Sequence, residues 1–496
     1  MRRFPSAFPT RPLLRAPRFT RHCQGTPETP DTIKNAIAAD EMAQRRREEA
    51  VDSRSVVFAC GSSADHRPRI AAAEAFDVAA AALPHTPNFC FLNVSFDYAA
   101  MVDAPEVVWY NLCRANSVTP STVRPQELHM IGGATRMQRP GGGFIQVLLG
   151  CIPDLQSDIF TFDTVPEEED LKEPNRPPPA ICFAFMDSRL TLQYERQLTD
   201  HLQVLGERLG ECPLIGGVYP ASQKSANDVG SRTGGDGNDQ SLNSEMGDSL
   251  FYLNDRVYVG SAAGAVIRSK MVKARFANII PSISVHKARV TSCSQYAKGV
   301  YTIEALDNRR ATDVIRDIYC LPEMQGKPSK VFLGLHHGDL RVPVSFIGDP
   351  SSGELRFTAP KRVEVHSNET IELLVDDVEL DSEVGAGALI GLQKQAQIKY
   401  VEKDINVAGD ARRSVVASSA AAFHFSHPGM NVLVHPDVNL TLGSSSVLYA
   451  PSLLQRCLGR FCPSTGAFCP GQVASFDGVS GVFSRSSSYA ILEGLS

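Results

Sequence analysis

Two pairs of adjacent glycines stand out as residues that could take part in chemistry. The pattern Ile-Gly-Gly begins at Ile131 and again at Ile215. Because glycine lacks a side chain, it reaches positive φ and lets other groups approach its backbone closely. The glycine N–H groups are therefore candidate contacts for a small ligand, and tight packing between the segments that carry them is the alternative explanation. The residues concerned are Gly132, Gly133, Gly216 and Gly217.

Polar residues beside the glycines complete this candidate ligand-binding site. The guanidinium of Arg136 suits a carboxylate, because its planar fork donates two parallel hydrogen bonds. An amino-acid-like ligand is therefore expected, with no catalytic residue, cofactor or metal. The neighbouring candidates are Thr135, Arg136, Ser222 and Gln223, together with Gly471 and Gln472 near the end of the chain.

The chain lacks the common motifs of catalytic chemistry. The chain has no Gly-x4-Gly-Lys-Ser/Thr phosphate loop and no Gly-x-Ser-x-Gly nucleophile elbow. His336 and His337 are adjacent in an expected strand, so their side chains face opposite sides. His424 and His427 are three residues apart and face opposite sides if that strand continues. The sequence therefore favours a binding protein over an enzyme.

The elements that must position the glycines occur in a repeated order. Each glycine pair follows an apolar strand and a helix, and precedes strands joined by a polar turn. This order predicts an α/β fold in which duplicated strand–helix–strand units form mixed sheets packed with helices. A third, weaker copy is considered between residues 420 and 476. The first copy covers 89–96, 104–115 and 144–152, and the second 180–186, 198–209 and 250–267.

Composition narrows the class of protein. The chain has 496 residues and a net charge of −6, which gives no electrostatic reason to bind nucleic acid. No stretch approaches the roughly 20 apolar residues of a transmembrane helix. Twelve cysteines are spread thinly, and the cluster of Cys457, Cys462 and Cys469 lacks zinc-site spacing. We therefore expect free thiols in a reducing compartment.

Two segments differ from the rest of the chain. In the segment 1–54, the first 24 residues contain six arginines and the first acid is Glu28, which is typical of an organelle transit peptide. Residues 31–50 are expected to form a polar helix. A mitochondrial location is the first expectation, and a disordered tail of a cytoplasmic protein is the alternative. Residues 221–248 are rich in Gly, Ser and Asn, which predicts a disordered insertion.

The order of several motifs resembles the FIST family. The run from Cys212 to Gly217 and the hairpin from Leu250 to Gly260 resemble the FIST N-terminal domain. Residues 290–291 and 303–307, followed by the helix at 311–318, resemble the start of the FIST C-terminal domain. The run from Gly466 to Val473 resembles its closing motif. The resemblance therefore covers roughly residues 55–490.

The resemblance implies two consecutive domains and a sensory role. The expected boundaries are 55–279 for the FIST N-like domain and 280–490 for the FIST C-like domain. Such proteins are described as small-ligand signal-transduction modules with amino acids suggested as ligands, and no catalytic residues are carried over. The alternative is an adaptor of a ubiquitin ligase, as in F-box–FIST proteins, although residues 1–54 show no convincing F-box. The segment from His424 to Gly429 departs from the family pattern.

Overall fold

The computed structural model describes most of the chain after residue 54. Within the described part, strands account for 55% and helices for 21%, so the fold is the expected mixed α/β type but strand-rich. No helix among the described residues is long and apolar enough to cross a membrane. The described ranges are 55–95, 103–120, 128–135, 144–162, 175–219, 249–279, 282–297, 299–321, 331–337, 340–359, 363–376, 388, 390–392, 394–396, 398–406, 412–426, 462–469, 471–476, 479–484 and 486–495.

The first repeat unit is built around one central strand. Strand β2 pairs in parallel with the glycine-bearing strand β3 and antiparallel with β4, which in turn pairs with β1. Helices α2 and α4 cover the outer face of this sheet and bury alanines, Val108 and Leu112 there. The elements are β1 (Val57–Ser63), α2 (Pro68–Ala82), β2 (Phe89–Ser95), α4 (Asp103–Ala115), β3 (His129–Thr135) and β4 (Ile145–Cys151).

The second unit repeats this pairing. Strand β6 is parallel to β7 and antiparallel to β10, and β10 pairs with β5. The predicted leucine stripe of α6 is buried against the outer face of this sheet, because Leu198, Leu202 and Leu205 share one side of the helix. The elements are β5 (Gln156–Thr161), β6 (Pro179–Asp187), α6 (Ser188–Leu209), β7 (Leu214–Tyr219) and β10 (Ala262–Arg268).

A third unit has the same order of pairing, so the expected duplication is a triplication. Strand β22 is parallel to β23 and antiparallel to β26, and β26 pairs with β11. The helix expected at 447–458 lies outside the described residues. The strands are β11 (Val272–Ile279), β22 (Ala420–Ser426), β23 (Ser464–Phe468) and β26 (Ser487–Gly494).

Hairpins link the units in chain order. The hairpin of β8 (Leu250–Leu253) and β9 (Arg256–Val259) belongs to the second unit in sequence. It joins the sheet of the first unit, where β8 pairs with β3. The hairpin of β24 (Gly471–Phe476) and β25 (Val479–Ser484) belongs to the third unit in sequence. It joins the sheet of the second unit, where β24 pairs with β7. Each of these glycine-bearing strands is therefore paired on both edges. Among the described strands, β23 pairs only with β22.

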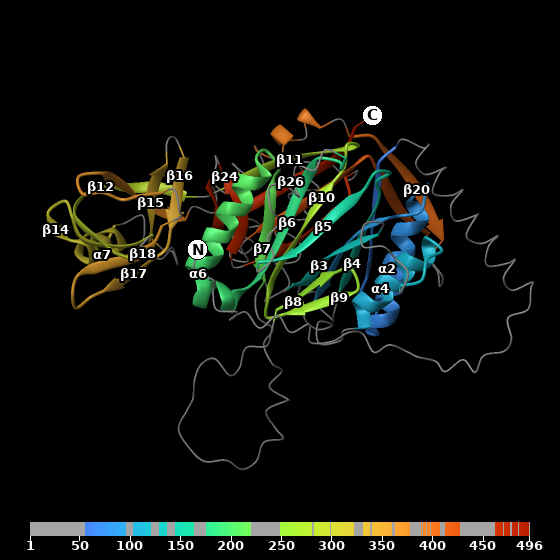
Figure 1. Cartoon of the computed structure of the whole chain (residues 1–496), viewed down its shortest axis with the longest axis horizontal. Helices are drawn as coiled ribbons and strands as arrows, with labels where there is room; N and C mark the ends of the chain where they lie inside the picture. The colour runs from blue at the N-terminus through green and yellow to red at the C-terminus, as the bar shows by residue number, and fades with distance from the viewer. Residues whose placement is uncertain are drawn as a thin grey trace, which may run out of the picture.

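A separate module interrupts the third unit between β11 and β22. It forms a sheet of its own and lies at one end of the molecule, to the left in Figure 1. Its core also includes Val479 and Phe483 of the β24–β25 hairpin. The module contains β12 (Ser282–Ala297), β13 (Val300–Leu306), β14 (Arg309–Arg310), α7 (Ala311–Tyr319), β15 (Val331–His337), β16 (Leu340–Val344), β17 (Phe346–Asp349), β18 (Glu354–Thr358) and β19 (Thr370–Asp376).

The strands of the expected C-terminal domain belong to more than one sheet. The expected range 280–490 contains both the module and most of the third unit. Strands β20 (Tyr400–Asn406) and β21 (Arg412–Ser418), from the same range, extend the sheet of the first unit through β1. Among the described strands, β11, β22, β23 and β26 pair only with one another, although the inserted module separates β11 from the others in the sequence.

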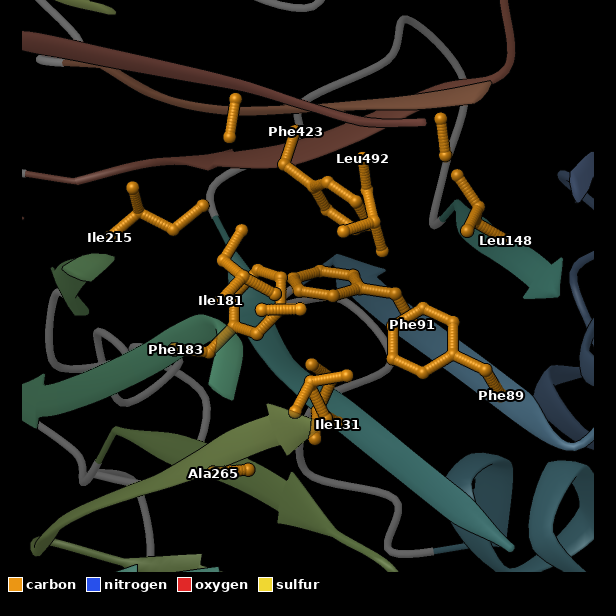
Figure 2. Close-up of a cluster of buried hydrophobic side chains, with 14 of the residues drawn as sticks. Phe89, Phe91, Ile131, Leu148, Ile181, Phe183, Ile215, Ala265, Phe423 and Leu492 are labelled. Atoms are coloured by element: carbon orange, nitrogen blue, oxygen red, sulfur yellow. The ribbon is translucent and has the colours of Figure 1, made fainter. Parts of the chain in front are cut away.

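One apolar core joins the three units. Each central strand has a phenylalanine one residue before the register partner of its first glycine, and Figure 2 shows these three side chains in the middle of the cluster. The ring centroids of Phe91, Phe183 and Phe423 are 5.7, 5.5 and 5.1 Å apart, which are favourable aromatic distances. We call these three side chains the Phe triangle. The triangle is the place where the three sheets meet.

Candidate functional site

The first glycine of each repeat occupies the same place in its sheet. Gly132, Gly216 and Gly466 are the register partners of the central-strand residues Leu92, Ala184 and His424. A Cβ atom added at these glycines would lie 1.8–1.9 Å from the carbonyl oxygen of the partner residue. Close approach of neighbouring backbones therefore requires glycine at all three positions.

The second glycines are also packed against protein atoms. A Cβ at Gly133 would lie 2.7 Å from a ring carbon of Tyr219, and one at Gly217 would lie 2.2 Å from Sγ of Cys469. The backbone of both glycine pairs belongs to strands that are paired on both edges. The expected exposure of these N–H groups to a ligand is therefore not met. The packing explanation accounts for Gly132, Gly133, Gly216 and Gly217.

The structure describes only some of the other expected site residues. Thr135 ends β3, while Arg136, Ser222 and Gln223 lie outside the described residues. Gln472 is fully buried and bonds within the chain: its Nε2 donates to Cys469 O, and its Oε1 accepts from the backbone N–H of Ser486. Gln472 therefore holds the loop beside β24.

Gly471, His336 and His424 each lie against other residues of the protein. A Cβ at Gly471 would lie 2.9 Å from Val482. His336 lies in the inserted module with its Nε2 3.8 Å from a carboxylate oxygen of Glu372, which Arg341 also contacts. His424 is buried on the outer face of the third sheet, and burial lowers the pKa of its imidazole to about 4. His424 is therefore neutral at pH 7, and His427 lies outside the described residues.

Polar groups enter the shared core one layer beyond the Phe triangle. Two residues after each triangle phenylalanine, on the same face of the central strand, the second and third units have Phe185 and Phe425. The first unit has Asn93, which is fully buried. An amide in an apolar core is costly unless it is hydrogen-bonded. Asn93 is therefore a departure from the repeat that calls for a physical reason.

The amide orientation of Asn93 is fixed by its partners. Its Nδ2 donates to Gly466 O at 2.6 Å and to Thr465 Oγ1 at 2.7 Å. Since a carbonyl oxygen only accepts, the atom facing Gly466 must be nitrogen. Both amide hydrogens are then used. The Oδ1 atom is buried and has no hydrogen-bond partner among the residues that the structure describes.

A chain of hydrogen bonds extends from Asn93 along the edge of β23. The hydroxyl of Thr465 donates to Oε1 of Gln146 at 3.2 Å. The Nε2 of Gln146 donates to Ser464 O at 2.9 Å and to Sγ of Cys60 at 3.3 Å. Side chains of the first unit therefore bind the carbonyl groups of β23, where the other glycine-bearing strands have a hairpin. Burial raises the pKa of the Cys60 thiol to about 12, so this network contains no thiolate at neutral pH.

A second unpaired polar group lies on the same face of the first sheet as Asn93. The ring of Tyr219 is fully buried between Phe185 and Phe251, at centroid distances of 5.4 and 5.3 Å, and covers Gly133. Gly133 is the register neighbour of Asn93 in the parallel pair, so the Tyr219 ring and the Asn93 side chain share the inner face of the first sheet. The Tyr219 hydroxyl also has no hydrogen-bond partner among the described residues. Burial raises the pKa of this phenol, which keeps it protonated.

Asn93 and Tyr219 lie toward the carboxyl ends of their strands, β2 and β7. Ser95 and Asp187 are the last residues of β2 and β6, and Tyr219 is the last residue of β7. The buried carboxylate of Asp187 accepts the N–H of Ser249, whose hydroxyl donates to Tyr219 O. We call Asn93, Tyr219, Thr465 and Gln146 the inner polar site. In the part of the chain that the structure describes, no group of three or more metal-binding side chains is present.

No protein-family model matches the chain, and no curated protein matches it.

Sequence reasoning missed the inner polar site. Asn93 lies within an otherwise apolar strand, and an alignment of the three central strands at their glycine partners would have set it against Phe185 and Phe425. The comparison with Phe425 depends on recognising β22 as the central strand of a third repeat. Thr465 and Gln146 carry no comparable signal, since single polar residues in strands are common.

Proposed function

We propose that this protein binds a small polar ligand at the inner polar site and acts as a small-ligand sensor. The observation that carries the proposal is a pair of buried oxygens on the inner face of the first sheet, Asn93 Oδ1 and the Tyr219 hydroxyl, which lack partners among the described residues. A buried polar group without a partner costs about 1–3 kcal/mol. A ligand that supplied the missing hydrogen bonds to both groups would explain why the protein retains them.

Two further observations support a binding role. In open α/β sheets, ligands bind beyond the carboxyl ends of parallel strands, and Tyr219 lies at such an end. The second and third units fill the Asn93 position with phenylalanine, so the repeat tolerates an apolar side chain there. The resemblance to FIST sensory modules agrees with this proposal and with a non-enzymatic role, and the family assignment is part of the proposal.

Thermal shift with a metabolite library tests the proposal on the full chain. A ligand at 100 times its Kd should stabilise the protein by about 2.7 kcal/mol. We expect at least one compound to raise the melting temperature of the wild type and to lose that effect in Asn93→Leu.

Asn278→Leu is the matched control for this screen. Asn278 is also an asparagine whose Nδ2 donates to a backbone carbonyl, that of Ser475, and whose Oδ1 lacks a partner among the described residues. It lies in β11, away from the inner polar site. The ligand effect should survive this substitution. A library without hits, or hits that bind Asn93→Leu equally well, would refute a ligand at the inner polar site.

A further inference from the structure

We infer that the ligand presents an uncharged carboxamide group to the inner polar site. This inference rests on the proposed function and names the chemistry that the site selects. In the proposed contact, an N–H of the ligand amide donates to Oδ1 of Asn93, and the amide carbonyl accepts the O–H of Tyr219. No covalent step is involved.

The Asn93 side chain can offer only an acceptor to a ligand. Both hydrogens of its Nδ2 are used, one on Gly466 O and one on Thr465 Oγ1. A rotation of the amide by 180° would place Oδ1 against the Gly466 carbonyl oxygen, so the orientation is held by the edge of β23. A ligand atom that meets Oδ1 must therefore carry a hydrogen.

The Tyr219 side chain offers a donor from a fixed position. Its ring is confined by Phe185 and Phe251 and by the close approach to Gly133. Any substituent at residue 133 would displace the ring, which explains why this position is glycine. The protonated hydroxyl can donate to a carbonyl oxygen. One ligand group that donates and accepts at once can satisfy both residues.

The charges around the site favour a neutral ligand group. The Cys60 thiol is protonated, and the described partners of Asn93, Thr465 and Gln146 in this network are all uncharged. A ligand carboxylate would therefore be buried among uncharged partners, and burial of an unpaired ion is far more costly than burial of an amide. The geometry of the described residues therefore disfavours the carboxylate expected from Arg136.

Matched amide and acid pairs test this inference by ligand-observed NMR and thermal shift. The probes are acetamide against acetate, nicotinamide against nicotinate, and glutamine against glutamate. We expect the amide of at least one pair to bind the full-length protein at least ten-fold more tightly than its acid. Tyr219→Phe should weaken that amide about five-fold, since it removes one hydrogen bond of ordinary net strength.

Two variants separate the ligand contact from a structural effect. Asn93→Leu should abolish amide binding, whereas Asn278→Leu should leave it unchanged, and each variant is first checked for a cooperative melting transition. If an acid binds more tightly than its amide, or if other compounds bind at the site and no amide does, the carboxamide inference is overturned while the proposed function stands. A structure with only water between Asn93 and Tyr219, together with an empty library screen, overturns both.

Discussion

His424 occupies the position that Leu92 and Ala184 hold in the other two units. Its imidazole is 2% exposed, and burial disfavours the charged form. The pKa of the folded state is about 4, below the ordinary value of 6.5. Between these values the unfolded chain binds a proton that the folded chain does not. The stability contributed by the neutral imidazole is therefore present above pH 6.5 and is lost as the pH falls towards 4.

This linkage predicts a measurable pH dependence. Between pH 7 and pH 5 the wild type should lose about 2 kcal/mol of unfolding free energy through His424 alone. His424→Leu, which introduces the residue found in the first unit, lacks this imidazole. Over the same pH interval, its unfolding free energy in urea titrations should fall by about 2 kcal/mol less than that of the wild type. The comparison cancels all other titrating groups. Equal losses in the two proteins would show that His424 does not titrate in this way.

Asn93 shows why the candidate site was only partly predictable. Its type and position in an apolar strand are visible in the sequence, but its hydrogen-bond partners are Thr465 and Gly466, more than 370 residues away. Nothing local in the chain indicates that β23 lies beside β2. The glycines were identified because their spacing recurs, yet their role depends on whether a neighbouring strand or a ligand fills the space beside them.

At the scale of elements, a second prediction concerns a glycine of the parallel strands. Gly216 has φ of +157°, and a Cβ there would lie 1.8 Å from the carbonyl oxygen of Ala184. Gly216→Ala should therefore destabilise the protein by about 3 kcal/mol or more, because both the backbone conformation and the clash oppose the methyl group. Urea unfolding measures this loss.

Gly481→Ala provides the control on a nearby strand of the same sheet. A Cβ at Gly481 would meet only Thr199, at an ordinary contact distance of 3.8 Å. The change in unfolding free energy should stay below about 1 kcal/mol. If Gly216→Ala cost no more unfolding free energy than Gly481→Ala, a methyl group would fit between β6 and β7, contrary to the structure.

Local patterns predicted many elements but not their assembly. The α6 leucine stripe, the β8–β9 turn at Asn254 and the apolar central strands all follow from short-range periodicity. The third unit was the weakest of the three in sequence because β11 and β22 are separated by the inserted module and by β20–β21. Sheet pairing across such a separation depends on tertiary contacts that no window of sequence contains.

At the scale of the whole molecule, the Phe triangle makes the three units depend on one another. Each ring packs against the other two, so the loss of any one leaves a cavity that all three sheets share. A buried Phe→Ala substitution costs about 3–5 kcal/mol. Phe423→Ala, in the third unit, should therefore destabilise the first unit as well.

The single tryptophan makes this prediction testable. Trp109 lies in α4 and is buried in the outer core of the first unit, so its fluorescence reports unfolding there. If the units unfold together, Phe423→Ala should lower the urea midpoint seen by Trp109 as much as Phe91→Ala does, and far-UV circular dichroism should give the same midpoint. Ile347→Ala, which truncates a side chain that is 77% exposed in the module, should shift neither signal. An unchanged Trp109 midpoint in Phe423→Ala would mean that the first unit is stable without the shared core, and the three sheets would then be independent folding units joined only by their hairpins.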